Sequence, residues 1–203
     1  MKILPLTLAL LAALPAAAQN AITIYGGVRG GGSFDETTST GGATTTSELA
    51  SAAALAFSID RALDPARNLQ LFVSAQRTTL PLVATTPGAP TALPLTITYV
   101  HVGGSNYIDG KAGQGGYLAG GVGATWMSPS QTGSQSELRP SMSLAFGYEH
   151  AFSPSVALRG EIRGYATLIQ SSGGFFCSGG CTVVIRGDAL FQLDALIGVS
   201  VRF

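Results

Sequence analysis

Charge is what this sequence most lacks. Asp, Glu, Lys and Arg make up 11% of the 203 residues, and the formal net charge is zero. Ordinary soluble domains carry about 25% charged residues. A water-soluble sandwich of this length would need more charge, whereas a surface that faces lipid needs little. The chain also has no basic run, so we expect no nucleic acid among its partners.

Long hydrophobic runs are missing too, except at the start. A short basic beginning precedes an apolar run over residues 3–15, and three alanines follow at 16–18. This pattern is typical of a cleaved secretory signal peptide over residues 1–18. A membrane anchor is the alternative, but the run is shorter than the roughly 20 apolar residues that a spanning helix needs. If the rest of the chain crosses a membrane, it crosses as strands.

Eight later segments alternate apolar and polar side chains with the period of a strand. Each is close to the 9–11 residues that a tilted strand needs to cross a bilayer, and an even number of strands suits a closed bacterial barrel. We predict one all-β domain over residues 19–203, an eight-stranded antiparallel up-and-down transmembrane β-barrel. The segments span about residues 21–32, 48–60, 68–78, 93–103, 116–127, 140–152, 155–170 and 189–203.

The connections differ in length in the way a barrel requires. With the N-terminus in the periplasm, long connections lie outside and shorter turns lie inside. The outer connections span residues 33–47, 80–92, 128–139 and 171–188, and the inner ones span 61–67, 104–115 and 153–154.

Aromatic residues give a further indication of the membrane boundary. Aromatic girdles mark both interfaces of such barrels. We expect outward-facing girdle residues at Phe57, Tyr99, Tyr148 and Phe203 near the periplasm and at Trp126 near the outside. Aromatic residues of a soluble core could produce the same scatter.

Charged residues of the alternating segments fall on the inner face. An eight-stranded barrel has an interior only wide enough for side chains, so balanced charges there predict an ion-pair network in a plugged lumen. Glycines at 121, 123, 147 and 198 would make room for Tyr25, Tyr117 and Tyr165. The network comprises Arg29, Glu149, Arg159, Glu161, Arg163, Asp194 and Arg202, with Asp60 near the rim.

The two cysteines, Cys177 and Cys181, lie in the last outer connection. In an exported protein they predict one structural disulfide. A redox-active pair would need a group that lowers a thiol pKa, and a metal site would need more ligands. Phe175 and Phe176 would then lie on a stiffened tip, where they contact a partner or lipopolysaccharide, or pack on the barrel mouth.

Candidate catalytic residues are few. The two histidines, His101 and His150, fall near periplasmic strand ends and are expected to be interfacial, with Ser105 and Ser153 at spacings that match no nucleophile motif. The chain has no Gly-x-Ser-x-Gly motif and no metal-ligand cluster. We therefore expect no enzymatic activity, no cofactor and no metal.

The pattern Leu196-x-Gly198-x-x-Val201-x-Phe203 closes the chain. This pattern resembles the assembly signal of bacterial outer-membrane β-barrels. Together with the eight segments and the signal peptide, it makes the chain similar to the small eight-stranded outer-membrane barrels, the OmpA-transmembrane and OmpX-like porin-family group. Residues 176–181 and 187–192 also resemble an uncharacterised proteobacterial subgroup. The resemblance implies an outer-membrane location, insertion by the barrel-assembly machinery, and contact with outer-membrane lipid and lipopolysaccharide. We expect no peptidoglycan-binding domain after the barrel.

Three functions follow from these expectations. The first is a structural or surface-interaction barrel that serves adhesion or envelope integrity and leaves room for an extracellular ligand. The second is a narrow channel for small or apolar solutes. The third is a lipid A-modifying enzyme.

Overall fold

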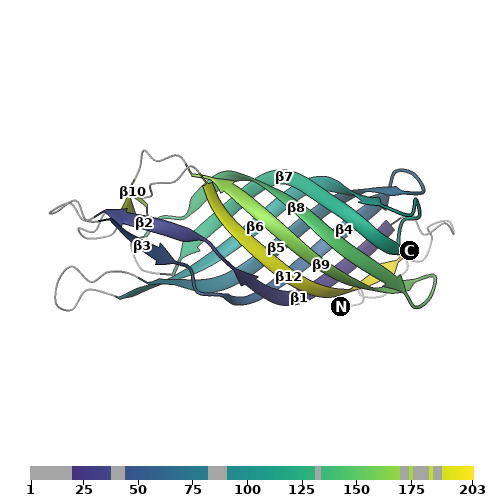
Figure 1. The fold of residues 1–203 in the computed structure, drawn as a ribbon, viewed down its shortest axis with the longest axis horizontal. Helices are drawn as coiled ribbons and strands as arrows, with labels where there is room; N and C mark the ends of the chain where they lie inside the picture. Colours follow the sequence, from purple (N-terminus) through teal and green to yellow (C-terminus); the bar gives the residue numbers. More distant parts are fainter. Residues whose placement is uncertain are drawn as a thin grey trace, which may run out of the picture.

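The computed structural model describes residues 20–37, 44–81, 91–130, 134–169, 174–175, 183–184 and 189–203. Eight of its strands close into one antiparallel barrel, in the order β1-β12-β9-β8-β7-β6-β5-β4 (Figure 1). The predicted fold is confirmed. The barrel strands are β1 (Asn20–Gly30), β4 (Ala52–Ala62), β5 (Arg67–Pro81), β6 (Ala92–Tyr107), β7 (Gly115–Pro129), β8 (Glu137–Ala151), β9 (Val156–Leu168) and β12 (Ala189–Arg202).

The two ends of the barrel differ, as the connection lengths predict. Asn20, Phe203 and three short turns lie at one end, the turn end (Figure 1). Two short hairpins extend the opposite end, the loop end, where the sequence predicts only loops. They are β2 (Ser33–Thr37) with β3 (Thr44–Glu48), and β10 (Gly174–Phe175) with β11 (Val183–Val184).

The barrel wall separates an apolar outside from a polar inside. Along residues 141–150 of β8, every second residue is buried, and the residues between them are exposed. The exposed set includes Leu144 at 71%, Phe146 at 56% and Tyr148 at 56%. A surface of this kind is stable in hydrocarbon and costly in water. Among the described residues, no helix is long and apolar enough to span a membrane.

The outward position predicted for Tyr99 on β6 is wrong. Tyr99 is fully buried inside the barrel and is no girdle residue. Leu95 and Ile97 are buried with it, whereas Thr96 and Thr98 lie on the outer side. The inversion arises because the loop end of the lumen is itself apolar, so the apolar face of this segment points inward. In the second half of β6, Val100 and Val102 point outward.

The turn end is closed by short, hydrogen-bonded turns. In the β4–β5 turn, the Asp64 carboxylate accepts the backbone N–H groups of Ala66 and Arg67 and pairs with the Arg67 side chain at 2.6 Å. These contacts, led by the Ala66 N–H, lower the pKa of Asp64. The turn after β6 reaches back to it, because Ala112 N–H donates to the Pro65 carbonyl at 2.6 Å.

Close strand contact makes one glycine of an adjacent pair indispensable. A Cβ at Gly27 would lie 2.0 Å from the Ala195 carbonyl oxygen on β12, whereas a Cβ at Gly26 would meet nothing within 4 Å. The seam between the first and last strands therefore depends on Gly27.

We predict that Gly27→Val prevents stable closure of the barrel, at a cost of about 3 kcal/mol or more, because overpacking against backbone cannot be relieved by a rotamer change. Gly26→Val, which adds a lipid-facing β-branched side chain, should fold like the wild type. Heat-modifiable migration on gels, after refolding into lipid vesicles, measures the folded fraction. Equal folding of the two variants would contradict this account of the seam.

Candidate functional site: the lumen

The loop end of the lumen is filled by an apolar layer. Its members point inward from the loop-end halves of their strands and from the residues that flank them. None is more than 5% exposed, so they fill the cross-section themselves. The apolar layer consists of Leu49, Leu80, Leu93, Leu95, Ile97, Met127, Ile169 and Leu190.

On the turn-end side of this layer lies a first ion pair, which joins two neighbouring strands. Arg29 and Asp194 stand opposite each other on β1 and β12, and Nε of Arg29 lies 2.5 Å from the Asp194 carboxylate. Both side chains are fully buried. The Arg29 guanidinium also lies 4.7 Å from the ring centre of Tyr99 and 4.8 Å from that of Tyr165, which stack at 4.0 Å. The cation is thus held by a carboxylate and two aromatic faces.

A larger ionic cluster fills the half toward the turn end. Arg159 reaches Asp60 at 2.8 Å and lies 3.6 Å from Glu149. Arg163 pairs with Glu161, two residues earlier on its own strand, at 2.7 Å. Gln70 joins the two pairs, because its amide donates to Asp60 at 2.7 Å and accepts from Arg163 at 2.9 Å.

Tyrosines complete the hydrogen bonding of the carboxylates. Tyr117 donates to Glu161 at 2.8 Å, Tyr165 donates to Asp194 at 2.8 Å, and Tyr107 donates to Glu149. A buried carboxylate has several acceptor sites, and one arginine leaves some of them unsatisfied. The phenols therefore lower the cost of keeping these charges away from water.

Glycines opposite the tyrosines make this possible, as the sequence predicts for two of them. Tyr117 stands opposite Gly147, and Gly147 stands opposite Glu161 on the next strand. A Cβ at Gly147 would lie 2.3 Å from the Tyr117 ring. Because the glycine leaves this space open, the ring crosses one strand and reaches the carboxylate beyond it. Gly198 likewise leaves room for the Tyr25 ring, which a Cβ would approach to 2.5 Å.

The last ion pair closes the turn end. Arg202, the last residue of β12, contacts Glu149 at 2.6 Å and also donates to the Gly113 carbonyl in the turn after β6. A cavity of about 50 Å³ remains beside this contact, lined by Asp60, Glu149, Arg159 and other residues. The structure thus joins all seven predicted lumen residues in ion pairs and adds Asp60 as a full member.

Sequence reasoning missed several partners. Gln70 and Ser74, which bonds Arg29, are neutral residues on an alternating strand, and nothing in the sequence marks them as ligands of a charge across the lumen. Their inward position on β5 could have been read from the alternation with Leu69, Leu71 and Val73.

The two histidines occupy different environments. His150 is exposed at the turn end, where its ring meets Phe152 edge-on at 5.2 Å. The prediction of an interfacial place is wrong for His101, which is buried in the lumen and lies 2.8 Å from the Ser141 hydroxyl. Its ring also lies 5.7 Å from Tyr99. This is a Ser–His contact within a packed aromatic group rather than an exposed nucleophile.

Among the described residues, no group of three or more acidic, His or Cys side chains could hold a metal ion.

The remaining predicted residues are placed as follows. Phe57, Trp126 and Tyr148 lie on the outer face, with Trp126 55% exposed. Of the assembly-signal residues, Leu196 and Gly198 point inward, and Val201 and Phe203 are 48% and 38% exposed. Residues 1–18, Phe176, Cys177 and Cys181 lie outside the described residues, and only the backbone of Phe175 is described.

Comparisons with known proteins agree on the fold. No protein-family model and no curated protein matches the chain. Neisserial surface protein A (NspA) is similar in structure, at 14% identity and a TM-score of 0.55, over 94% of this chain and 100% of that chain. OprG from Pseudomonas aeruginosa is similar at 9% identity and a TM-score of 0.56, over 91% and 96% of the two chains. The outer membrane protein AlkL is similar at 13% identity and a TM-score of 0.56, over 94% of each.

The fold and the outer surface together define the class of this protein. It is a small eight-stranded barrel of the outer-membrane type, with an apolar belt outside and charged side chains inside. Such a closed barrel leaves no unpaired sheet edge in the hydrocarbon. The protein is therefore an outer-membrane protein.

We predict that Asp194→Ala destabilises the barrel by about 3–5 kcal/mol, because it leaves Arg29 buried and unpaired. The double variant Arg29→Met, Asp194→Leu removes both charges and should regain most of the loss. Urea unfolding in lipid vesicles, followed by the fluorescence of the single tryptophan, Trp126, measures this difference.

The matched control is Arg67→Ala, which breaks an ion pair whose arginine is 66% exposed. It should leave the free energy of unfolding unchanged, because water screens the pair. An Asp194→Ala variant as stable as this control would show that the lumen pair contributes nothing.

Proposed function

We propose that this protein is a non-conducting outer-membrane barrel whose function lies in the connections at its loop end, in adhesion or envelope integrity. The observation that carries the proposal is the filled lumen. An apolar layer occupies the loop-end half and a charge-balanced cluster occupies the other half. A barrel with a filled lumen can support binding loops but does not offer a passage for solutes.

The filling leaves little room for a solute. The arginines that cross the lumen, Arg29, Arg159 and Arg163, are each no more than 1% exposed. A conducting path would have to separate them from their carboxylates, and an uncompensated buried charge is strongly unfavourable. The apolar layer adds a second barrier, since it offers a permeating ion nothing in exchange for its hydration shell.

The loop end supports the surface role. The β2–β3 hairpin continues past the barrel rim (Figure 1), and β11 lies against β2. The first and last long connections therefore meet there. Connections on a rigid scaffold are common binding elements.

We predict that the purified protein gives no discrete conductance steps in a planar lipid bilayer, because the ion pairs and the apolar layer of the described strands fill the lumen. A porin of known conductance, inserted under the same conditions, serves as the control. Reproducible steps from the wild type would favour the alternative function, a narrow channel for small or apolar solutes.

Surface binding is tested on intact cells of a Gram-negative host that expresses the protein. Replacing residues 34–47 with a short Gly–Ser linker should reduce adhesion to epithelial cells and matrix proteins, or raise detergent sensitivity, at least fivefold relative to wild type. Arg67→Ala, at the opposite end, is the matched control and should change neither. Unchanged adhesion and unchanged detergent sensitivity in a folded linker variant would refute a role for this connection.

The Ser141–His101 contact gives the enzymatic alternative a specific test. Ser141→Ala should leave the lipid A of expressing cells unchanged in mass. A mass difference between wild-type and variant cells would support a lipid A-modifying activity instead.

A further inference from the structure

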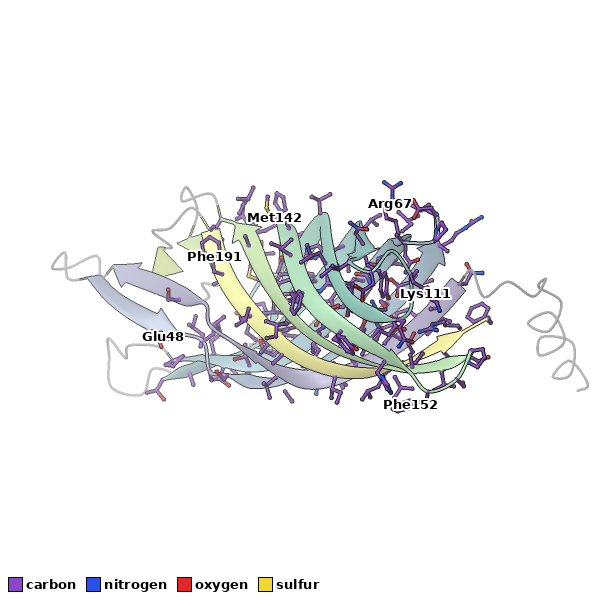
Figure 2. The ribbon with its side chains drawn as sticks, turned by 45° about the vertical axis from the view of Figure 1, so that its right-hand side comes forward. Glu48, Arg67, Lys111, Met142, Phe152 and Phe191 are labelled. Atoms are coloured by element: carbon purple, nitrogen blue, oxygen red, sulfur yellow. The ribbon has the colours of Figure 1, made fainter. Side chains whose placement is uncertain are left out.

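The connection between β6 and β7 covers the lumen at the turn end. We call residues 108–114, which form this connection, the lid; Lys111 among them lies at the turn end (Figure 2). The Ala112 side chain is partly buried against the inward-facing rings of Tyr107 and Tyr117. The lid also forms one wall of the small cavity beside the ionic cluster. It therefore lies between the buried charges and the solvent at this end.

Two hydrogen bonds of the lid reach other parts of the protein. Ala112 N–H donates to the Pro65 carbonyl in the β4–β5 turn at 2.6 Å. The Gly113 carbonyl accepts from the Arg202 guanidinium, which also pairs with Glu149 at 2.6 Å. The backbone N–H of Arg202 donates at 2.9 Å to a carbonyl of the β8–β9 turn, which fixes this residue to the barrel. One side chain thus joins the lid to the ionic cluster and to the last strand.

Glycines with positive φ shape the backbone of the lid. The φ angle is 70° at Gly110, 89° at Gly113 and 90° at Gly115, the residue directly after the lid. Glycine adopts such angles without the steric cost that other residues meet, and small residues at the ends of elements often absorb the backbone rotation of a hinge. The lid can therefore swing about its ends, and a contact at its centre is needed to keep it closed.

We propose that the lid opens and closes the turn end of the lumen, and that Arg202 is the latch that holds it shut. When Arg202 releases Gly113, the lid loses a charge-assisted hydrogen bond, and the cavity beside Glu149 opens to solvent. Arg202 lies on β12, which pairs with β1 to close the barrel, so the latch forms only when the last strand is in place. The lid lies at the opposite end from the connections that carry the proposed function and acts independently of them.

The glycines supply a variant that breaks the latch and a matched control. A Cβ at Gly113 would lie 2.5 Å from the Arg202 guanidinium carbon, so Gly113→Ala forces the flexible end of this side chain to move aside. A Cβ at Gly110 would meet nothing within 4 Å. Gly110→Ala therefore imposes the same kind of backbone strain at positive φ without touching Arg202. Arg202→Met removes the guanidinium and breaks the latch in a second way.

The experiment measures how fast a maleimide–polyethylene glycol reagent labels Ala112→Cys, whose side chain lies on the inner side of the lid. The two native cysteines are replaced by Cys177→Ser and Cys181→Ser. Each protein is folded in detergent micelles, and heat-modifiable migration first verifies that it is folded. With the latch intact, we expect labelling at least tenfold slower than that of Gln114→Cys, a lid position that is exposed.

Breaking the latch should expose the inner side of the lid. Gly113→Ala and Arg202→Met, each added to Ala112→Cys, should raise its labelling rate at least fivefold. Gly110→Ala should leave that rate unchanged.

Three results would overturn the proposal. Labelling of Ala112→Cys as fast as that of Gln114→Cys, with the latch intact, would mean that the lid does not cover the lumen. A rate that rises in neither latch variant would mean that Arg202 does not hold the lid. A rate that rises in only one of them, or equally in Gly110→Ala, would assign the effect to local strain or lost stability.

Discussion

The pairing of buried arginines with carboxylates is the constraint on which the rest of this structure depends. Arg29, Arg159 and Arg163 have almost no contact with solvent, and each lies against Asp194, Asp60 or Glu161. An unpaired guanidinium in such a place is too costly to keep, so the partners must arrive together as the barrel closes. The pairing therefore links β1 with β12, and β9 with β4 and β8.

Several other features support that pairing. The tyrosines satisfy carboxylate oxygens that the arginines leave free, and the glycines at 147 and 198 open the space through which two of the rings pass. Arg202 extends the network to the turn that covers one end of the lumen. The apolar layer covers the other end and keeps water from the Arg29–Asp194 pair, which strengthens it.

The sequence predicts the strands and the inward charges of this structure well. Side chains in a barrel wall must alternate, because one face meets lipid and the other meets the polar interior. The sequence predicts the eight strands, the inward charges, and the fit of Tyr117 and Tyr25 against glycines. It fails at Tyr99, since an apolar lumen inverts the signal there. The sequence does not predict that Arg159 pairs with Asp60, because these residues lie on strands that are not neighbours in the barrel. Alternation shows which face of a strand a residue occupies, but it does not identify the residue that it meets across the lumen.

The most direct test of the paired lumen is the hydrogen exchange of the arginine Nε–H groups, measured by solid-state NMR of the protein in lipid bilayers. Slow exchange for Arg29, Arg159 and Arg163, with fast exchange for the exposed Arg67, is the result expected of a dry, ion-paired interior. Fast exchange for all four arginines would mean that water fills the barrel and that the side chains do not close it.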